Sequence, residues 1–172
     1  MVNGIFSISI NGPVRECFAT PAAGEDSMGL HEDVGYRLDL SGGFLKEAEQ
    51  DFGLHRWRSC TAGSVLVVEN AGIAVLMLFG VSPSTHKPGM HLSQLLSEGT
   101  LESKAAELIE ELLPMFEQHD SHEKMLAKYG DEAGYRLPWE LFGEPEASAA
   151  LGAARKAVRI ARDLAAIVLP MT

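Results

Sequence analysis

The longest hydrophobic pattern in the chain lies between residues 64 and 80, in the stretch SVLVVENAGIAVLMLFG. Residues 65–68 are all apolar, and residues 73–79 are apolar at every position. Asn70 and Gly72 separate the two runs, and both residue types tolerate the positive φ angles of a tight turn. The pattern predicts a β-hairpin whose second strand is covered on both faces and is central to a sheet.

Shorter stretches before this hairpin show the two-residue period of β-strands. Residues 5–10 alternate apolar and hydroxyl side chains, and residues 36–40 and 54–60 also alternate. Residues 14–19 follow a turn and are expected to pair with the first strand, whereas residues 44–52 fit a short helix. Five or six strands with short connections predict an antiparallel sheet.

From residue 91 onward the hydrophobic period becomes that of an α-helix. Residues 101–116 carry a stripe of large apolar side chains, but Pro114 lies inside it and predicts a kink or a restart. An alanine-rich final helix is expected over residues 146–169. Residues 81–90 contain two prolines and a glycine, so they are expected to form the connecting loop.

We therefore predict an α+β fold in a single domain, residues 1–172. In it, an antiparallel β-sheet from the N-terminal half (residues 1–80) is packed on one face by C-terminal helices (residues 91–169). Hydrophobic residues make up 46% of the chain and charged residues 22%, which is typical of a globular domain rather than of a disordered chain.

Several features bear on where the protein works. No apolar run approaches the length of a membrane span, and the N-terminus lacks the basic and apolar regions of a secretory signal. The two cysteines, Cys17 and Cys60, have no metal-type spacing, and we expect reduced thiols. These observations predict a cytoplasmic protein with no membrane partner.

The charge is acidic and unevenly distributed. The net charge is −10, and residues 98–146 hold 13 acidic and 4 basic residues. This balance argues against a general nucleic-acid binder, because phosphate contacts require Lys and Arg. It suits a basic protein partner, although solubility alone would also explain it. A basic stripe on the last helix, Arg155, Arg159 and Arg162 with Lys156, suits either a phosphate or acidic partner or pairing with the protein's own glutamates.

Catalytic signals are sparse. His119 and His122, with Asp120 between them, suggest a metal-dependent hydrolase as an alternative function, because residues three apart share a helix face. His91, His119–Asp120 and Asp163 also follow the order of HD-type phosphohydrolases, but those enzymes are all-helical and the strand-rich first half argues against the match.

A Cys60 nucleophile paired with His55 or His86 is a second catalytic alternative, against a buried structural thiol. No GxSxG elbow and no phosphate-binding glycine loop is present.

Aromatic residues near the acidic third provide the best candidate surface. Tyr135, Trp139 and Phe142 lie beside Glu140 and Glu144, where they either plug the sheet–helix junction or contact a partner. We predict a non-catalytic, acidic protein-binding module without a cofactor. An inhibitor or immunity-type protein that neutralises a basic toxin or nuclease is the expected form, followed by a secretion chaperone.

The expected partner-binding residues are the acids and the tryptophan of the acidic third: Glu107, Glu110, Glu111, Asp120, Glu123, Trp139 and Glu140. Electrostatic steering by the acids and anchoring by the tryptophan are the expected mechanism. A homodimer and a small-ligand-binding domain, with its pocket between the sheet and the last helix, remain open.

Overall fold

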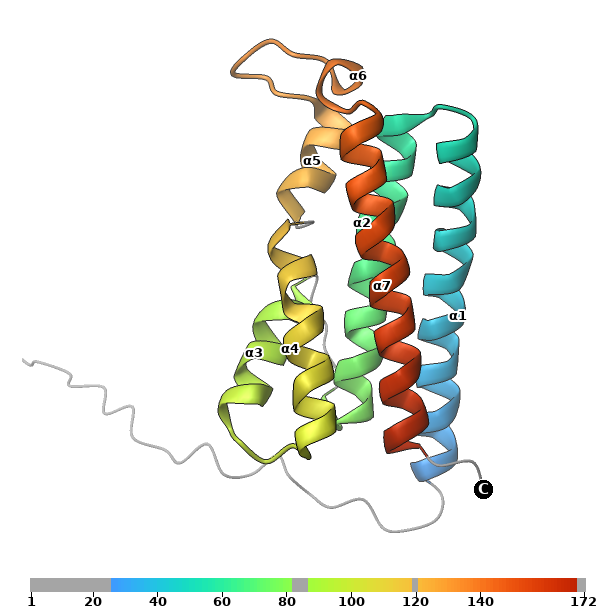
Figure 1. Cartoon of the computed structure of the whole chain (residues 1–172), viewed down its shortest axis with the longest axis vertical. Coiled ribbons are helices and arrows are strands. Elements are labelled where there is room, and N and C mark those ends of the chain that lie inside the picture. Colours follow the sequence, from blue (N-terminus) through green and yellow to red (C-terminus); the bar gives the residue numbers. More distant parts are fainter. Residues whose placement is uncertain (1–25, 82–86, 119–120, 170–172) are drawn as a thin grey trace, which may run out of the picture.

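A computed structural model describes residues 26–81, 87–118 and 121–169. These residues form seven helices: α1 (Asp26–Gly53), α2 (Trp57–Leu78), α3 (Pro88–Ser97), α4 (Ser103–Gln118), α5 (Ser121–Tyr129), α6 (Pro138–Leu141) and α7 (Glu144–Val168). Helix α2 runs through the middle, with α1 and α7 on one side and α3, α4 and α5 on the other (Figure 1).

The predicted α+β fold is wrong, because the described residues are helical and contain no β-strand. The expected strands at 36–40 and 54–60 lie in α1 and around the start of α2, and the expected hairpin at 64–80 lies in α2 and the turn after it. The expected strands at residues 5–10 and 14–19 lie outside the described residues. The observed architecture is an all-α bundle.

The helices predicted for the C-terminal half are confirmed within a few residues. The expected helix at 101–116 is α4, and the expected final helix at 146–169 is α7. Helix α4 continues through Pro114, so the helix does not restart there. Pro114 is exposed, and the ridge of buried residues Leu108, Ile109, Leu112 and Met115 holds α4 to the core.

Helix α2 has no continuous polar face because other helices pack around it. Val67, Val68, Val75 and Leu76 are almost completely buried in the main hydrophobic core. A helix covered on every side needs no polar face, so its sequence lacks the 3.6-residue alternation of a surface helix. The inference that residues 73–79 are buried on both faces is therefore consistent with the fold, but the element is a helix.

Asn70 and Gly72, which we expected to form a turn, instead take part in packing and hydrogen bonding within α2. A β-carbon at Gly72 would lie 2.5 Å from Cζ of Phe116, so glycine lets α4 approach α2 closely. Asn70 donates from Nδ2 to the carbonyl oxygen of Leu66 at 2.8 Å and accepts a hydrogen bond from Arg37 of α1 at 3.1 Å. Both residues therefore fit inside the helix.

Helix α7 packs on the core through small residues. Ala147, Ala150, Ala154, Ala157 and Ala161 are all completely buried and recur at alternating spacings of three and four. This is the heptad spacing of a seam between helices, and alanine at each position allows close approach. The alanines explain how α7 lies against both α1 and α2.

Helix α2 is also long enough and apolar enough, by length and composition, to cross a membrane. Its 22 residues contradict the expectation that no apolar run approaches that length, an expectation that followed from dividing the run at a turn. Of its most apolar window, 72% is buried by the other helices. A central bundle helix has the same properties, so this is weak evidence for a membrane span.

Candidate interaction surface

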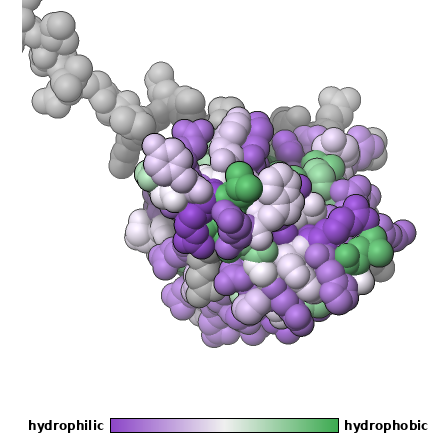
Figure 2. Space-filling view, turned by 90° about the horizontal axis from the view of Figure 1, so that it is seen from above, coloured by the Kyte–Doolittle hydropathy of each residue, from purple (hydrophilic) through white to green (hydrophobic). Residues whose placement is uncertain are grey.

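Exposed aromatic and aliphatic side chains gather at one end of the bundle, where α5 ends and α6 and α7 begin (Figure 1). We call Tyr129, Tyr135, Leu137 and Trp139 the apical surface. Their exposed fractions are 53%, 94%, 59% and 71%, in that order. Figure 2 looks onto this end and shows apolar side chains as separate green areas among polar ones. This end of the bundle is thus mixed rather than uniformly hydrophobic.

Hydrogen bonds give the segment between α5 and α6 a defined shape. Asp131 and Arg136 form an isolated antiparallel bridge, with each amide donating to the other's carbonyl oxygen at 2.9 Å. The carboxylate of Asp131 also accepts a hydrogen bond from the amide of Gly134 at 3.0 Å. Tyr135, the last residue of this turn before Arg136, has a φ of 53°, an unusual conformation for an aromatic residue. The turn holds Tyr135 out from the bundle.

Helix α6 begins directly after this turn and carries Trp139. The carboxylate of Glu140 accepts a hydrogen bond from the amide of Leu137 at 2.7 Å, which satisfies a donor just before α6. Pro138 and Phe142 are buried on either side of Trp139. The backbone of Trp139 is therefore held while its indole stays exposed.

Arg58 of α2 connects the bundle to the apical surface. Its guanidinium lies 5.9 Å from the centroid of the Trp139 ring. Its Nη1 also donates to the carbonyl oxygen of Ala127 in α5 at 2.9 Å, and its Nη2 donates to Ser59 at 3.0 Å. One arginine thus contacts α2, α5 and α6.

The aromatic residues predicted as a group divide into two roles. Phe142 is only 6% exposed, as the plugging alternative requires. Tyr135 and Trp139 face solvent, as the partner-contact alternative requires. The described residues contain no sheet, so they offer no sheet–helix junction for these aromatic residues to fill.

The predicted acidic residues are not brought to one patch. Glu107, Glu110 and Glu111 lie on α4, which makes no packing contact with α6. Glu123 lies on α5, Glu140 is beside Trp139, and Asp120 lies outside the described residues. The acids on α4 are therefore separate from the apical surface.

Three residues of the basic stripe on α7, Arg155, Lys156 and Arg159, pair with glutamates of the protein itself. Glu111 forms ion pairs with Lys156 at 3.0 Å and with Arg159 at 3.4 Å. The hydrogen bond from Lys156 lowers the pKa of Glu111 below its ordinary value. Arg155 pairs with Glu49 of α1 at 2.8 Å. The stripe thus bridges α7 to its neighbours α1 and α4, as the self-pairing alternative proposes.

The metal hypothesis gains no support from the described residues. They contain no group of three or more His, Cys, Asp or Glu side chains placed to hold a metal ion. His122 is exposed on α5, while His119 and Asp120 lie outside the described residues. The all-helical fold removes the objection to an HD-type enzyme, but His91 is on α3 and Asp163 is on α7, and these two helices do not contact each other.

The environment of Cys60 is that of a structural thiol. Cys60 is completely buried among Ala48, Ala147 and Leu151, and its Sγ lies 3.8 Å from the carbonyl oxygen of Ala147. Burial raises the pKa of this thiol, so the reactive thiolate is disfavoured. His55 is exposed at the α1–α2 turn and stacks on Trp57, and His86 lies outside the described residues.

An open depression of about 480 Å³ lies along α5 and the residues after it. It is lined by His122, Met125, Leu126, Tyr129, Gly130, Asp131 and Glu132. The predicted ligand pocket between a sheet and the last helix has no counterpart, since there is no sheet in the described residues. The depression is a shallow feature beside the apical surface rather than an enclosed ligand cavity.

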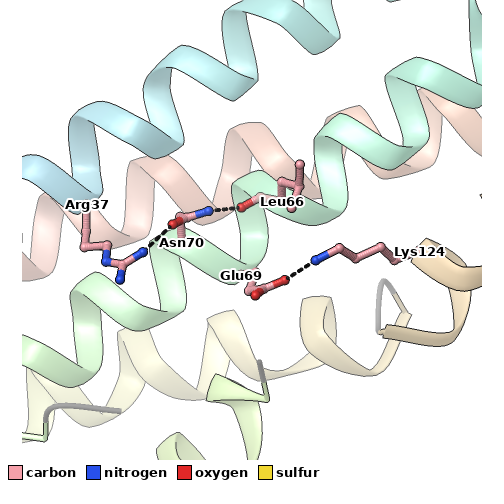
Figure 3. A network of polar contacts seen from close by, with 5 residues as sticks. All are labelled: Arg37, Leu66, Glu69, Asn70 and Lys124. Carbon is pink, nitrogen blue, oxygen red and sulfur yellow. Dashed lines mark hydrogen bonds and ion pairs between the residues drawn. The ribbon is translucent and has the colours of Figure 1, made fainter. Parts of the chain in front are cut away.

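Two polar contacts that the sequence analysis missed cross the bundle on α2 (Figure 3). Arg37 of α1 binds Asn70 from one side, and Lys124 of α5 pairs with Glu69 from the other at 3.0 Å. The available signal was the pair Glu69–Asn70 inside an otherwise apolar run. A polar pair in a buried helix requires partners, because burying an unpaired charge is costly.

No protein family model, no characterised protein and no solved structure matches this chain. A function for this protein must therefore be inferred from its own residues.

Proposed function

We propose that the protein is a non-catalytic module that binds a basic protein through its apical surface. The observation that carries the proposal is the exposure of Trp139 and Tyr135 on a hydrogen-bonded backbone at one end of an acidic bundle. Trp and Tyr are the residues most often found at energetic hot spots of protein interfaces. A preordered segment also loses little entropy on binding.

The charge favours a basic partner over an acidic one. The net charge is −10, and Glu132, Glu140 and Glu144 are exposed close in sequence to Tyr135 and Trp139. A field of this sign accelerates encounter with a positively charged protein and weakens as salt is added. In this proposal, the three acids near Trp139 supply the charge beside the binding surface, whereas the α4 glutamates steer a partner only at longer range.

Inhibition of a basic toxin or nuclease is the form of this function that the charge favours, and a secretion chaperone is the second. Both would act without a cofactor. A cytoplasmic location and the absence of nucleic-acid and membrane partners belong to the same proposal. Glu140 supports the surface in two ways, because its carboxylate fixes the backbone at Leu137 and adds charge beside the indole.

The test is affinity capture from lysate of the source organism with four forms of the full chain. These are the wild type, Trp139→Ala, Tyr135→Ala and the matched control Tyr36→Ala, whose aromatic ring is 64% exposed on α1. We expect the wild type and the control to hold one basic protein at low salt. Each apical variant should weaken this binding at least about tenfold, as loss of a hot-spot side chain does.

Equal capture by all four forms would contradict the apical surface as the binding site. A second copy of the chain is the other possible occupant, and it would appear as a concentration-dependent dimer that Trp139→Ala dissociates. Steering is tested separately with Glu110→Lys, since Glu110 makes no ion pair within the described residues, whereas Glu111 does. Unchanged affinity and salt dependence in this variant would exclude steering by α4.

A further inference from the structure

Helices α5 and α6 are attached to the bundle differently from the other helices. Helix α4 contributes Leu108, Ile109 and Leu112 to the main hydrophobic core. No described side chain of α5 or α6 belongs to that core or to the smaller cluster around Cys60. Ala127 of α5 and Pro138 of α6 are buried, whereas Met125 and Tyr129 of α5 are more than half exposed. Little apolar surface therefore holds these two helices.

Two polar contacts join α5 to α2. Nζ of Lys124 lies 3.0 Å from Oε2 of Glu69, whose side chain is only 13% exposed (Figure 3). Three turns toward the start of α2, Arg58 donates to the carbonyl oxygen of Ala127 at 2.9 Å. Of the described helices, α5 packs only against α2 and α6. Two charged residues of α2 thus act as attachment points for α5.

We propose that α5 and α6 form an arm that opens from α2 as a unit while α1, α2, α4 and α7 stay folded. Regions with few buried apolar contacts open locally at lower free energy than the core. The salt bridge and the hydrogen bond to Arg58 act as latches, because both join the arm to the central helix. Opening solvates Glu69 and Lys124 together, so the charge of Glu69 is hydrated rather than left buried without its partner.

The arm carries the whole apical surface. Tyr129 ends α5, Trp139 lies in α6, and Tyr135 and Leu137 lie between them. Opening separates the Trp139 ring from the Arg58 guanidinium that lies 5.9 Å from it in the closed arrangement. The position of the arm therefore regulates how the apical surface is presented. This consequence rests on the proposed function, whereas the opening itself is a property of the free protein.

The test is hydrogen–deuterium exchange of the free full chain, followed by mass spectrometry of its peptides. In the wild type, amides of α5 and α6 should exchange at least about tenfold faster than those of α2 and α7. Lys124→Met should raise the exchange of α5 about tenfold further, the effect of losing one charge-assisted hydrogen bond. Exchange in α2 and α7 should stay unchanged.

A matched control is Lys104→Met on α4. Lys104 pairs with Glu107 of the same helix at 3.4 Å, and both side chains are about two-thirds exposed, so this ion pair joins no two helices. It should leave the exchange of every helix nearly unchanged. Arg58→Gln is a second latch variant, which releases the Ala127 carbonyl and should accelerate α5 in the same way.

The inference of a mobile arm would be wrong if the amides of α5 and α2 exchanged at equal rates in the wild type. It would also be wrong if a latch variant accelerated the exchange of all helices together. The outcome is independent of any partner. If α5 and α6 exchange fast but Trp139→Ala captures the partner as well as the wild type does, the inference of a mobile arm holds and the proposed function is rejected. If all helices exchange equally but Trp139→Ala loses the partner, the proposed function holds and the inference of a mobile arm is rejected.

Discussion

The side chain of Cys60 occupies a small apolar cluster between α2 and the start of α7. Because burial raises the pKa of its thiol, the neutral form persists at pH values where an exposed thiol ionises. We expect alkylating reagents to modify Cys60 in the native protein only at the rate of unfolding. Peptide mass spectrometry, which separates Cys60 from Cys17, measures this rate with and without urea. Rapid modification of Cys60 in the native state would return the nucleophile hypothesis.

The ring of Phe116 lies against two glycines, Gly72 in α2 and Gly89 in α3. A β-carbon at Gly89 would lie 2.6 Å from Cβ of Phe116, and one at Gly72 would lie 2.5 Å from Cζ. The ring is thus enclosed near its base and at its far end, so it has little freedom to move away. Gly72→Ala should destabilise the protein by about 1–3 kcal/mol, as overpacking a core does.

Gly152→Ala is the control for Gly72→Ala. Gly152 is an exposed residue of α7 with nothing within 4 Å of its added β-carbon. This substitution should stabilise the protein by up to about 1 kcal/mol through helix propensity alone. Urea unfolding measures both variants. Stabilisation by Gly72→Ala would show that the contact with Phe116 relaxes without cost.

At the level of single helices, the sequence predicted α4 and α7, found only residues 44–52 of α1, and failed for α2. The apolar stripes of α4 and α7 alternate with charged faces at helical spacing, because these helices lie on the surface of the bundle. Helix α2 has no exposed face to mark its period, and a short apolar run does not by itself distinguish a buried strand from a buried helix. Splitting it at Asn70 and Gly72 then produced a hairpin.

Helix α1 misled for a different reason. Residues 36–40 alternate apolar and charged side chains over five positions, too short a window to separate a period of two from a period of 3.6. Gly42 and Gly43 also suggested a strand end, but tertiary packing overrides helix propensity in the middle of a long helix. The core positions Val34, Ser41 and Ala48 recur every seven residues, which is a helical signal on a longer scale.

The ion pairs between α4 and α7 make a pH-dependent contribution to stability. Because the hydrogen bond from Lys156 lowers the pKa of Glu111, the unfolded chain binds this proton more tightly than the folded protein does. The stabilisation is therefore complete above the ordinary glutamate pKa of about 4.3 and is lost as the pH falls through the lower folded value. The contribution is small because the carboxylate is exposed.

Glu111→Gln should accordingly be less stable than the wild type at pH 7, with the difference shrinking toward zero below about pH 4. Urea unfolding across this pH range provides the measurement. Glu110→Gln controls for the loss of one surface negative charge, since Glu110 makes no ion pair within the described residues. A difference that persists undiminished at pH 3 would show that the pair with Lys156 is not its source.

For the molecule as a whole, the acidic balance could be inferred from composition, and Trp139 could be singled out as a candidate from its acidic neighbours, but its exposure could not. The assembly of the site could not, because its parts come from distant segments. Arg58 and Ala127 are 69 positions apart in the sequence, and no local pattern indicates that they are in contact. Glu69 and Lys124 are likewise 55 positions apart. Such contacts depend on how the helices pack.

Helix α2 should determine the stability of the entire bundle, whereas the apical surface should contribute almost nothing to it. Leu76 is completely buried between α2 and its neighbours, so Leu76→Ala should cost about 2–5 kcal/mol. Tyr135 is 94% exposed, so Tyr135→Ala should change the free energy of unfolding by less than about 0.5 kcal/mol. Urea unfolding followed by helical circular dichroism measures both values. The pair separates stability from binding, because the proposed function requires Tyr135→Ala to weaken partner capture in a protein that is as stable as the wild type. If Tyr135→Ala destabilised the bundle by as much as Leu76→Ala, the apical turn would be part of the folding core, and its exposed aromatic residues would no longer argue for a partner.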